Sequence, residues 1–443
     1  MLWLKQIAPN LVPIMTIVND PKRGQYIAIR WKRPDEPMPE PETPYGWRHL
    51  IPFLNEQMLK LYDAEAHKLR GDPDALSFFI QVAEALPEGY PLKGKVVMAA
   101  LLHGLLMPVW WWLPEKDKKW LTDTIEGVDA RLPSPPEPQK PYSEDFEPEP
   151  LPSESAKEMY MVLDEWYERM KGEWAKWAKE RYGDTKPEKI KDGIVHRLTD
   201  KLASDKEFVD AFINSPFNVA FATTEDALER QEALKSSLQW VISGLIGVWA
   251  QTSSDEHPLS YALQIAVAQE FGLKENYEFI LKWLEALEEH TPGITKHTAI
   301  LYNTLKPILH KFVRAVYEET QDFLSKSGLT EIYLIRGLRL PEDRAEGLSW
   351  ERYQLFKAVA FPVSSWSLDQ KTARNFATLK SEEGKKPVLY VLKLPKSAFP
   401  YIFSTALTGW GCFDEAEFVL MLPINQKVWA AEWVHRDVLL GEQ

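Results

Sequence analysis

The chain has 443 residues, 45% hydrophobic and 26% charged, a balance typical of globular proteins and enough for two or three domains with their own cores. Its formal charge of −13 argues against a general nucleic-acid binder, which would normally carry a basic surface. The single cysteine, Cys412, excludes an intrachain disulfide and a cysteine-rich zinc site.

The N-terminal residues predict a β-hairpin. Two β-branched apolar segments, residues 11–18 and 25–31, are separated by a polar turn that contains proline and glycine. No basic region and no small-residue cleavage site accompany the first apolar segment, so a cleavable signal peptide is not expected. A reducing, cytoplasmic setting is the simplest location.

Residues 96–113 form the most apolar run of the chain. Their length is just enough for a bilayer, and Trp110, Trp111 and Trp112 resemble an interfacial belt. However, Gly104 and Pro108 interrupt the run. We therefore favour a buried core helix over a membrane span.

Residues 132–152 mark the clearest boundary. They contain eight prolines and several acids, a composition that cannot form a core and that predicts an extended linker or a strap on another surface. The sequence thus divides into an N-terminal α+β domain of unknown role (1–131), a Pro-rich acidic linker (132–152), a helical middle domain (153–295) and a C-terminal domain (296–443).

The middle of the chain is predicted to be mainly helical. Ser155 and Glu158 form a capping-box pattern, and an apolar stripe follows at steps of three and four. This stripe consists of Met159, Leu163, Trp166, Met170, Trp174 and Trp177. Roughly four or five helices are expected over residues 186–290, and a further helix over 296–325 that stops at Ser327 and Gly328.

The last third contains three short motifs on predicted strands. An apolar strand beginning at Glu331 ends in Arg336-Gly337. The second motif, Ser365-Trp366-Ser367, precedes a short helix capped by Ser367 or Asp369. The third is Glu415-Ala416-Glu417, where strand alternation predicts two carboxylates on one face, about 7 Å apart.

In this order, the three motifs resemble the arginine-serine-glutamate branch of the mono-ADP-ribosyltransferases. Trp366 stands where that family usually has threonine, and both serines are retained. The resemblance covers roughly residues 296–443 and implies an α+β fold, in which mainly helical N-terminal and middle regions precede a two-sheet β core with its own helical lobe.

The resemblance also implies roles for the motif residues. Arg336 would bind the pyrophosphate of NAD through bidentate contacts. Gly337 would let the backbone approach the nicotinamide, and Ser365 would hold Glu417 and the nicotinamide ribose in register. Ser367 is a further NAD-binding candidate, although the local turn and helix start also explain it. Glu417 would stabilise the cationic transition state.

Two further residues point to the acceptor. A glutamate at the position of Glu415 accompanies arginine acceptors in that family, so Glu415 would orient a guanidinium. Trp410, between two glycines in the preceding loop, is expected to contribute to acceptor recognition.

The resemblance therefore implies transfer of ADP-ribose from NAD to an arginine of a target protein, with NAD as a substrate and no metal. One alternative is an inactive transferase fold used for structure or interaction in a larger assembly, such as a phage particle. Another is an NAD glycohydrolase, which needs no acceptor. Residues 1–295 would bind an assembly or delivery partner. If the protein is an effector or toxin, it would be delivered into a target or host cell.

Overall fold

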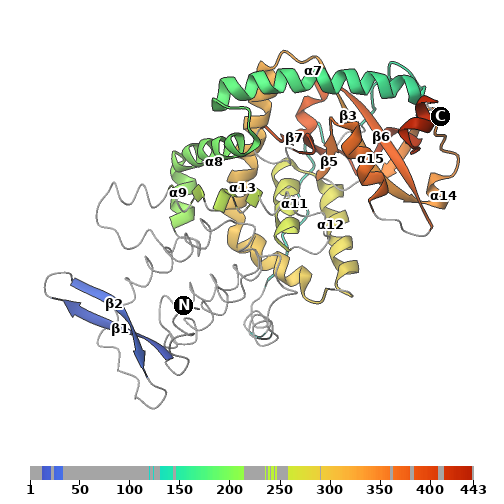
Figure 1. Cartoon of the computed structure of the whole chain (residues 1–443). Coiled ribbons are helices and arrows are strands. Elements are labelled where there is room, and N and C mark those ends of the chain that lie inside the picture. The colour runs from blue at the N-terminus through green and yellow to red at the C-terminus, as the bar shows by residue number, and fades with distance from the viewer. Residues whose placement is uncertain are drawn as a thin grey trace. The chain divides into compact units, whose positions relative to one another are not determined.

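The computed structural model describes residues 12–20, 24–32, 130–142, 146–213, 258–289, 291–359, 363–379, 384–407 and 414–441, with a few single positions between them. A helical region precedes a seven-stranded antiparallel sheet, so the α+β class is confirmed (Figure 1). The predictions for residues 96–113, Trp410 and Cys412 lie outside the described residues. Within the described ranges, no helix is both long and apolar enough to cross a membrane.

The chain divides into two compact units. Residues 1–125 and 212–240 form one unit, and residues 126–211 and 241–443 form the other. In the first unit, β1 (Val12–Asp20) and β2 (Gly24–Lys32) form the predicted antiparallel hairpin. The predicted ranges 132–152 and 296–443 both belong to the second unit, which also contains all the candidate site residues.

Six helices are described before the sheet, and their ends follow local sequence signals. They are α7 (Ala156–Tyr182), α8 (Pro187–Ala203), α9 (Lys206–Ile213), α11 (Pro258–Phe271), α12 (Lys274–Leu287) and α13 (Ile294–Lys326). The Ser155 side chain accepts a hydrogen bond from the Glu158 amide at 3.3 Å, which confirms the predicted N-cap of α7. Ser327 caps the C-terminus of α13, and Gly328 follows with φ +70°.

The predicted apolar stripe of α7 packs on the sheet. Met159, Leu163, Trp166 and Met170 are buried. The Trp166 ring lies 5.2 Å from the Tyr333 ring on β3, and the Trp174 ring is stacked on Phe418 of β8 at 6.0 Å. Helix α7 therefore runs across strands that are far apart in sequence (Figure 1).

A buried carboxylate links three of the helices. Glu319 of α13 is 8% exposed and accepts hydrogen bonds from the Nε atoms of Arg181 on α7, at 2.9 Å, and Arg197 on α8, at 3.0 Å. A charge this well enclosed is tolerated because it is paired and hydrogen-bonded. The pairing holds α7 and α8 against α13.

The seven strands of the second unit pair in the order β4-β9-β6-β3-β5-β8-β7. Their bounds are β3 (Glu331–Pro341), β4 (Gln354–Val359), β5 (Val363–Ser367), β6 (Lys385–Pro395), β7 (Ile402–Thr405), β8 (Glu417–Met421) and β9 (Asn425–Glu432). Only the pair Ile335 and Ser367 connects β3 to β5. The strands thus link into one sheet, with a narrow junction between a four-stranded and a three-stranded part. The two-sheet core that the resemblance implies stays a prediction.

Short helices lie between the strands and after the last one. They are α14 (Glu342–Ala345), α15 (Gln370–Thr378), the 3-10 helix η3 (Lys396–Tyr401) and α16 (Arg436–Leu440). The Asp369 carboxylate caps α15 by accepting from the amides of Lys371, at 3.0 Å, and Thr372, at 3.1 Å. Of the two predicted N-caps, Asp369 is the one used.

The proline-rich segment lies as a strap on the second unit. Proline removes backbone donors, so the segment is held through its carbonyl oxygens, which accept from side chains of the helices and sheet. These contacts include Gln269 to Ser134 at 2.7 Å, Tyr401 to Pro141 at 3.1 Å and Trp429 to Glu149 at 3.0 Å. The sequence predicted either an extended linker or a strap, and the structure shows a strap.

Candidate functional site

The three sequence motifs converge on adjacent strands. Arg336 lies on β3, Ser365 and Ser367 lie on β5, and Glu417 begins β8. Strands β3, β5 and β8 are neighbours in the sheet, and Ile335, Ser367 and Glu417 occupy one row across them. Segments distant in sequence are thereby placed side by side at the narrow junction of the sheet.

Arg336 has an enclosed guanidinium nitrogen without a partner. Its Nη1 atom is shielded from solvent and makes no hydrogen bond with the described residues, although the residue as a whole is partly exposed. Burial lowers the pKa of Arg336, while Tyr390 and Glu417 act in the opposite direction. Glu417 is therefore close enough for its charge to act on Arg336.

Glu417 is a buried carboxylate, 5% exposed. Its strand position is well defined, because its backbone oxygen accepts from the Ala406 amide at 2.9 Å and the residue pairs with Ser367 on β5. A carboxylate that is removed from water and lies near a guanidinium can stabilise positive charge more strongly than a solvated one.

The two serines have different environments. Ser365 is the only exposed residue of β5, so its hydroxyl is available to a ligand. The Ser367 hydroxyl is already engaged, since it donates to the Glu415 carbonyl oxygen and accepts from the Asp369 amide at 2.9 Å. Ser367 thus fastens the turn before β8 to the start of α15.

The predicted position of Glu415 is wrong. Residues 414–416 form a turn, and β8 begins only at Glu417, so the two glutamates do not share a strand face. Ala416 has φ 46°, in the left-handed region, and this breaks the strand alternation. The turn is fixed by Ser367 and by a 3.2 Å bond from the Leu368 amide to the Ala416 carbonyl.

Glu415 is partly exposed in this turn, two residues before Glu417. Burial raises the pKa of the Glu415 carboxyl, and the negative charge of Asp414 raises it further. The carboxyl therefore holds its proton to a higher pH than an ordinary glutamate. It lies on the turn that leads into Glu417.

Gly337 has a structural reason to be glycine. A Cβ atom at this position would lie 1.7 Å from the Ala373 carbonyl oxygen, so α15 rests directly on the backbone of β3. This close packing explains the residue without a ligand. It also places α15, through Ala373 and Ala377, beside the strand that carries Arg336.

Tyr390 on β6 is a residue of this region that the sequence did not indicate. It pairs with Arg336 across the sheet, is 2% exposed, and its hydroxyl has no hydrogen-bond partner among the described residues. The sequence around Tyr390 is an ordinary apolar strand. Only the long-range register of β3 and β6 reveals its position.

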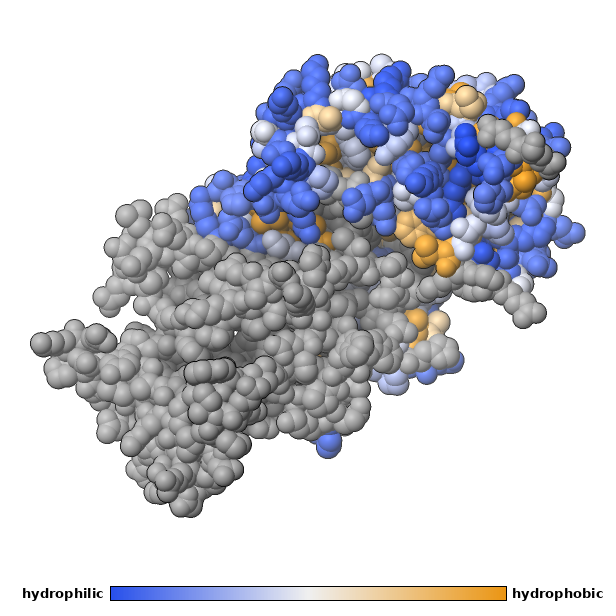
Figure 2. Space-filling view, viewed as in Figure 1, coloured by the Kyte–Doolittle hydropathy of each residue, from blue (hydrophilic) through white to orange (hydrophobic). Residues whose placement is uncertain are grey.

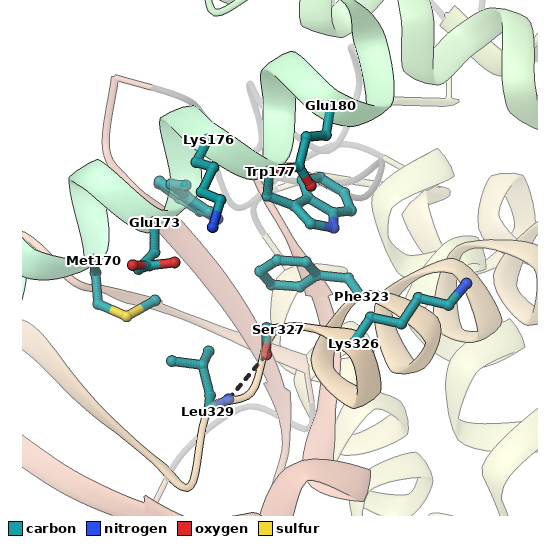
Figure 3. A pocket seen from close by; sticks show the side chains of 10 residues that line it. Met170, Glu173, Lys176, Trp177, Glu180, Phe323, Lys326, Ser327 and Leu329 are labelled. Carbon is teal, nitrogen blue, oxygen red and sulfur yellow. Dashed lines mark hydrogen bonds between the residues drawn. The ribbon is translucent and has the colours of Figure 1, made fainter.

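A separate pocket of about 110 Å³ lies between α7 and the end of α13 (Figure 3). Trp177 and Phe323 form its aromatic wall, with their rings 4.4 Å apart, and charged side chains such as Lys176 and Glu180 surround it. None of the candidate residues above lines it. In the described ranges, no group of three or more His, Cys, Asp or Glu residues is arranged to hold a metal ion.

Comparison with models of protein families, with curated proteins and with solved structures finds no match for this chain. Any function assigned to this chain therefore depends on its residues and their geometry.

Proposed function

We propose that this protein is a mono-ADP-ribosyltransferase that transfers ADP-ribose from NAD to an arginine of a target protein. The observation that carries the proposal is the placement of Arg336 on β3 and Glu417 on β8, the two strands that flank β5, on which Ser365 is exposed. The charge of Glu417 acts on Arg336 across this distance. A guanidinium suits a pyrophosphate, and a shielded carboxylate suits a ribosyl cation.

In the proposed reaction, the bond between the nicotinamide nitrogen and ribose C1′ breaks, and its electron pair leaves with nicotinamide. Glu417 stabilises the positive charge that develops on the ribose, and Arg336 holds the pyrophosphate so that the ribose stays beside that carboxylate. A guanidine nitrogen of the acceptor then bonds to C1′ and loses one proton. The products are ADP-ribosylated arginine, nicotinamide and a proton.

Glu415 is proposed to orient the acceptor and receive its proton. Its position in the turn, rather than on the strand, leaves it partly exposed, which a group that meets a protein substrate requires. Its raised pKa brings it nearer to the range in which a carboxylate accepts protons effectively. Trp410, which lies outside the described residues, remains a candidate for acceptor recognition.

The surface of the second unit is compatible with a protein acceptor that binds through polar contacts. Figure 2 shows a mostly hydrophilic surface with scattered apolar positions on the face in view. Exposed large apolar residues of the described chain include Phe376 of α15 and Leu379, which caps the C-terminus of that helix. Delivery or assembly through residues 1–295 remains part of the proposal.

The test is nicotinamide release from NAD together with labelling of an arginine-rich protein. Glu415→Gln is expected to lose labelling while it retains part of the nicotinamide release, because only the acceptor step needs that carboxylate. Glu417→Gln is expected to lose both. Release without labelling by the unmodified chain would favour the glycohydrolase alternative, and no release at all would favour an inactive fold.

A further inference from the structure

Two enclosed hydrogen-bond donors lie next to each other on β3 and β6. Arg336 and Tyr390 are paired in the antiparallel register, so their side chains share one face of the sheet. The Nη1 atom of Arg336 and the hydroxyl of Tyr390 both lack a hydrogen-bond partner among the described residues. Buried donors without partners are rare in folded proteins, and two neighbouring ones require an explanation.

The packing of Tyr390 does not explain its hydroxyl. The ring is 2% exposed and lies 5.8 Å from the Phe356 ring in a tilted arrangement. A phenylalanine would make the same ring contact and would avoid the cost of desolvating a hydroxyl. The hydroxyl is therefore suited to an acceptor atom supplied from outside the chain.

The charges around Tyr390 indicate which acceptor. Burial raises its pKa to about 12, while the positive charges of Arg344 and Arg336 act in the opposite direction. Arg344 is on α14, immediately after β3, and its side chain is exposed. Two guanidinium groups near one free hydroxyl form a set of donors that matches phosphate oxygens.

We propose that Tyr390 and Arg344 complete, with Arg336, a subsite for a pyrophosphate group. The proposal rests on the proposed function, because it takes that group to be the pyrophosphate of NAD. Tyr390 donates to one phosphate oxygen from the sheet face, and Arg344 contacts the group from the solvent side. Glu417 lies on the other side of Arg336 in the strand order, where the proposed function places the ribose.

The test uses the full chain and inorganic pyrophosphate as the probe, with binding measured by calorimetry. Tyr390→Phe keeps the ring and removes only the hydroxyl, so we expect about a tenfold weaker affinity, the effect of one hydrogen bond to a charged group. Arg344→Gln should weaken binding most at low salt, because its charge is exposed. Arg339→Gln is the matched control.

Arg339 suits this purpose because it lies three residues after Arg336 on β3, which places it on the opposite face of the strand. Its substitution should leave pyrophosphate affinity unchanged. Circular dichroism of each variant ensures that only folded proteins are compared.

The outcomes separate this inference from the proposed function. If the unmodified chain binds pyrophosphate and Tyr390→Phe binds it less tightly, the subsite is supported even where no nicotinamide is released. If nicotinamide is released but Tyr390→Phe binds pyrophosphate as tightly as the unmodified chain, the subsite is refuted and the function stands. Absence of pyrophosphate binding by the unmodified chain also overturns the subsite.

Discussion

At the scale of single residues, the carboxyl of Glu415 is the group whose charge state matters most to the proposed transfer. Its raised pKa means that the folded protein binds this proton more tightly than the unfolded chain does. That stability contribution is complete at low pH and is lost as the pH rises through the raised pKa. At neutral pH the ionised carboxylate therefore costs stability. We expect that Glu415→Gln does not lower the free energy of unfolding at this pH.

The same shift predicts a pH dependence of labelling. Glu415 should become protonated at a higher pH than an ordinary glutamate. As the pH is lowered, arginine labelling should therefore decrease at a higher pH than nicotinamide release does. Asp414→Asn removes one cause of the raised pKa, and the midpoint of the labelling profile should move to lower pH. Parallel pH profiles for labelling and release, or an unchanged midpoint in Asp414→Asn, would contradict this role.

Residue-level prediction from the sequence worked where the signal is local. Ser155 and Asp369 were recognisable helix caps, because a side-chain oxygen three residues before a free amide acts within one turn. The turn at Glu415 was missed, because strand alternation assumes ordinary backbone angles and Ala416 does not have them. Alanine gives no sequence signal for a positive φ.

At the scale of elements, the contact of α15 with β3 depends on the missing side chain of Gly337. Gly337→Ala would force a Cβ against the Ala373 carbonyl, so either α15 or β3 must move. We expect a loss of roughly 1–3 kcal/mol or more in the free energy of unfolding, the usual cost of overpacking. Urea unfolding followed by circular dichroism measures it.

Gly172 supplies the control for this substitution. It lies inside α7, and a Cβ there would meet nothing within 4 Å. Gly172→Ala should therefore stabilise the protein by up to about 1 kcal/mol, since alanine is the better helix former. Equal effects of the two substitutions would show that α15 does not rest on the β3 backbone.

The packing of α7 and α8 against α13 is expected to depend on the buried carboxylate of Glu319. Glu319→Gln would leave the guanidinium of Arg181, whose side chain is only 15% exposed, with the longer ion pair to Asp322 at 3.4 Å. The expected loss is about 3 kcal/mol, as for other broken buried ion pairs. The measurement is again the free energy of unfolding in urea.

The neighbouring Glu318 offers a matched surface pair. Glu318 contacts Lys201 with both side chains largely exposed, so Glu318→Gln should change stability by no more than about 1 kcal/mol. A Glu319→Gln variant as stable as Glu318→Gln would mean that the pairing does not hold α7 and α8 on α13.

At the scale of the whole molecule, long-range pairing is what the sequence could not supply. The order of motifs along the chain predicted that Arg336 and Glu417 belong together, and the strand order brings them onto nearby strands. The single junction between β3 and β5 was not predictable, since it depends on one residue pair. The same holds for Tyr390, whose partner is determined by strand register.

The proline-rich strap, residues 132–152, also depends on long-range contacts that the sequence does not reveal. Its proline content predicted an extended chain, because proline cannot join a helix or a sheet ladder. Its route was set by side chains from elsewhere, such as Gln269 and Trp429, that donate to its carbonyl oxygens. The choice between a free linker and a strap therefore required the folded structure.

The central claim is that Arg336 and Glu417 act on one dinucleotide, and nicotinamide release from NAD tests it most directly. The unmodified chain should release nicotinamide, and Glu417→Gln should do so at least a hundredfold more slowly, because the carboxylate that stabilises the ribosyl cation is gone. Unchanged circular dichroism would confirm that the variant is folded. Equal release by the folded Glu417→Gln variant would contradict the account.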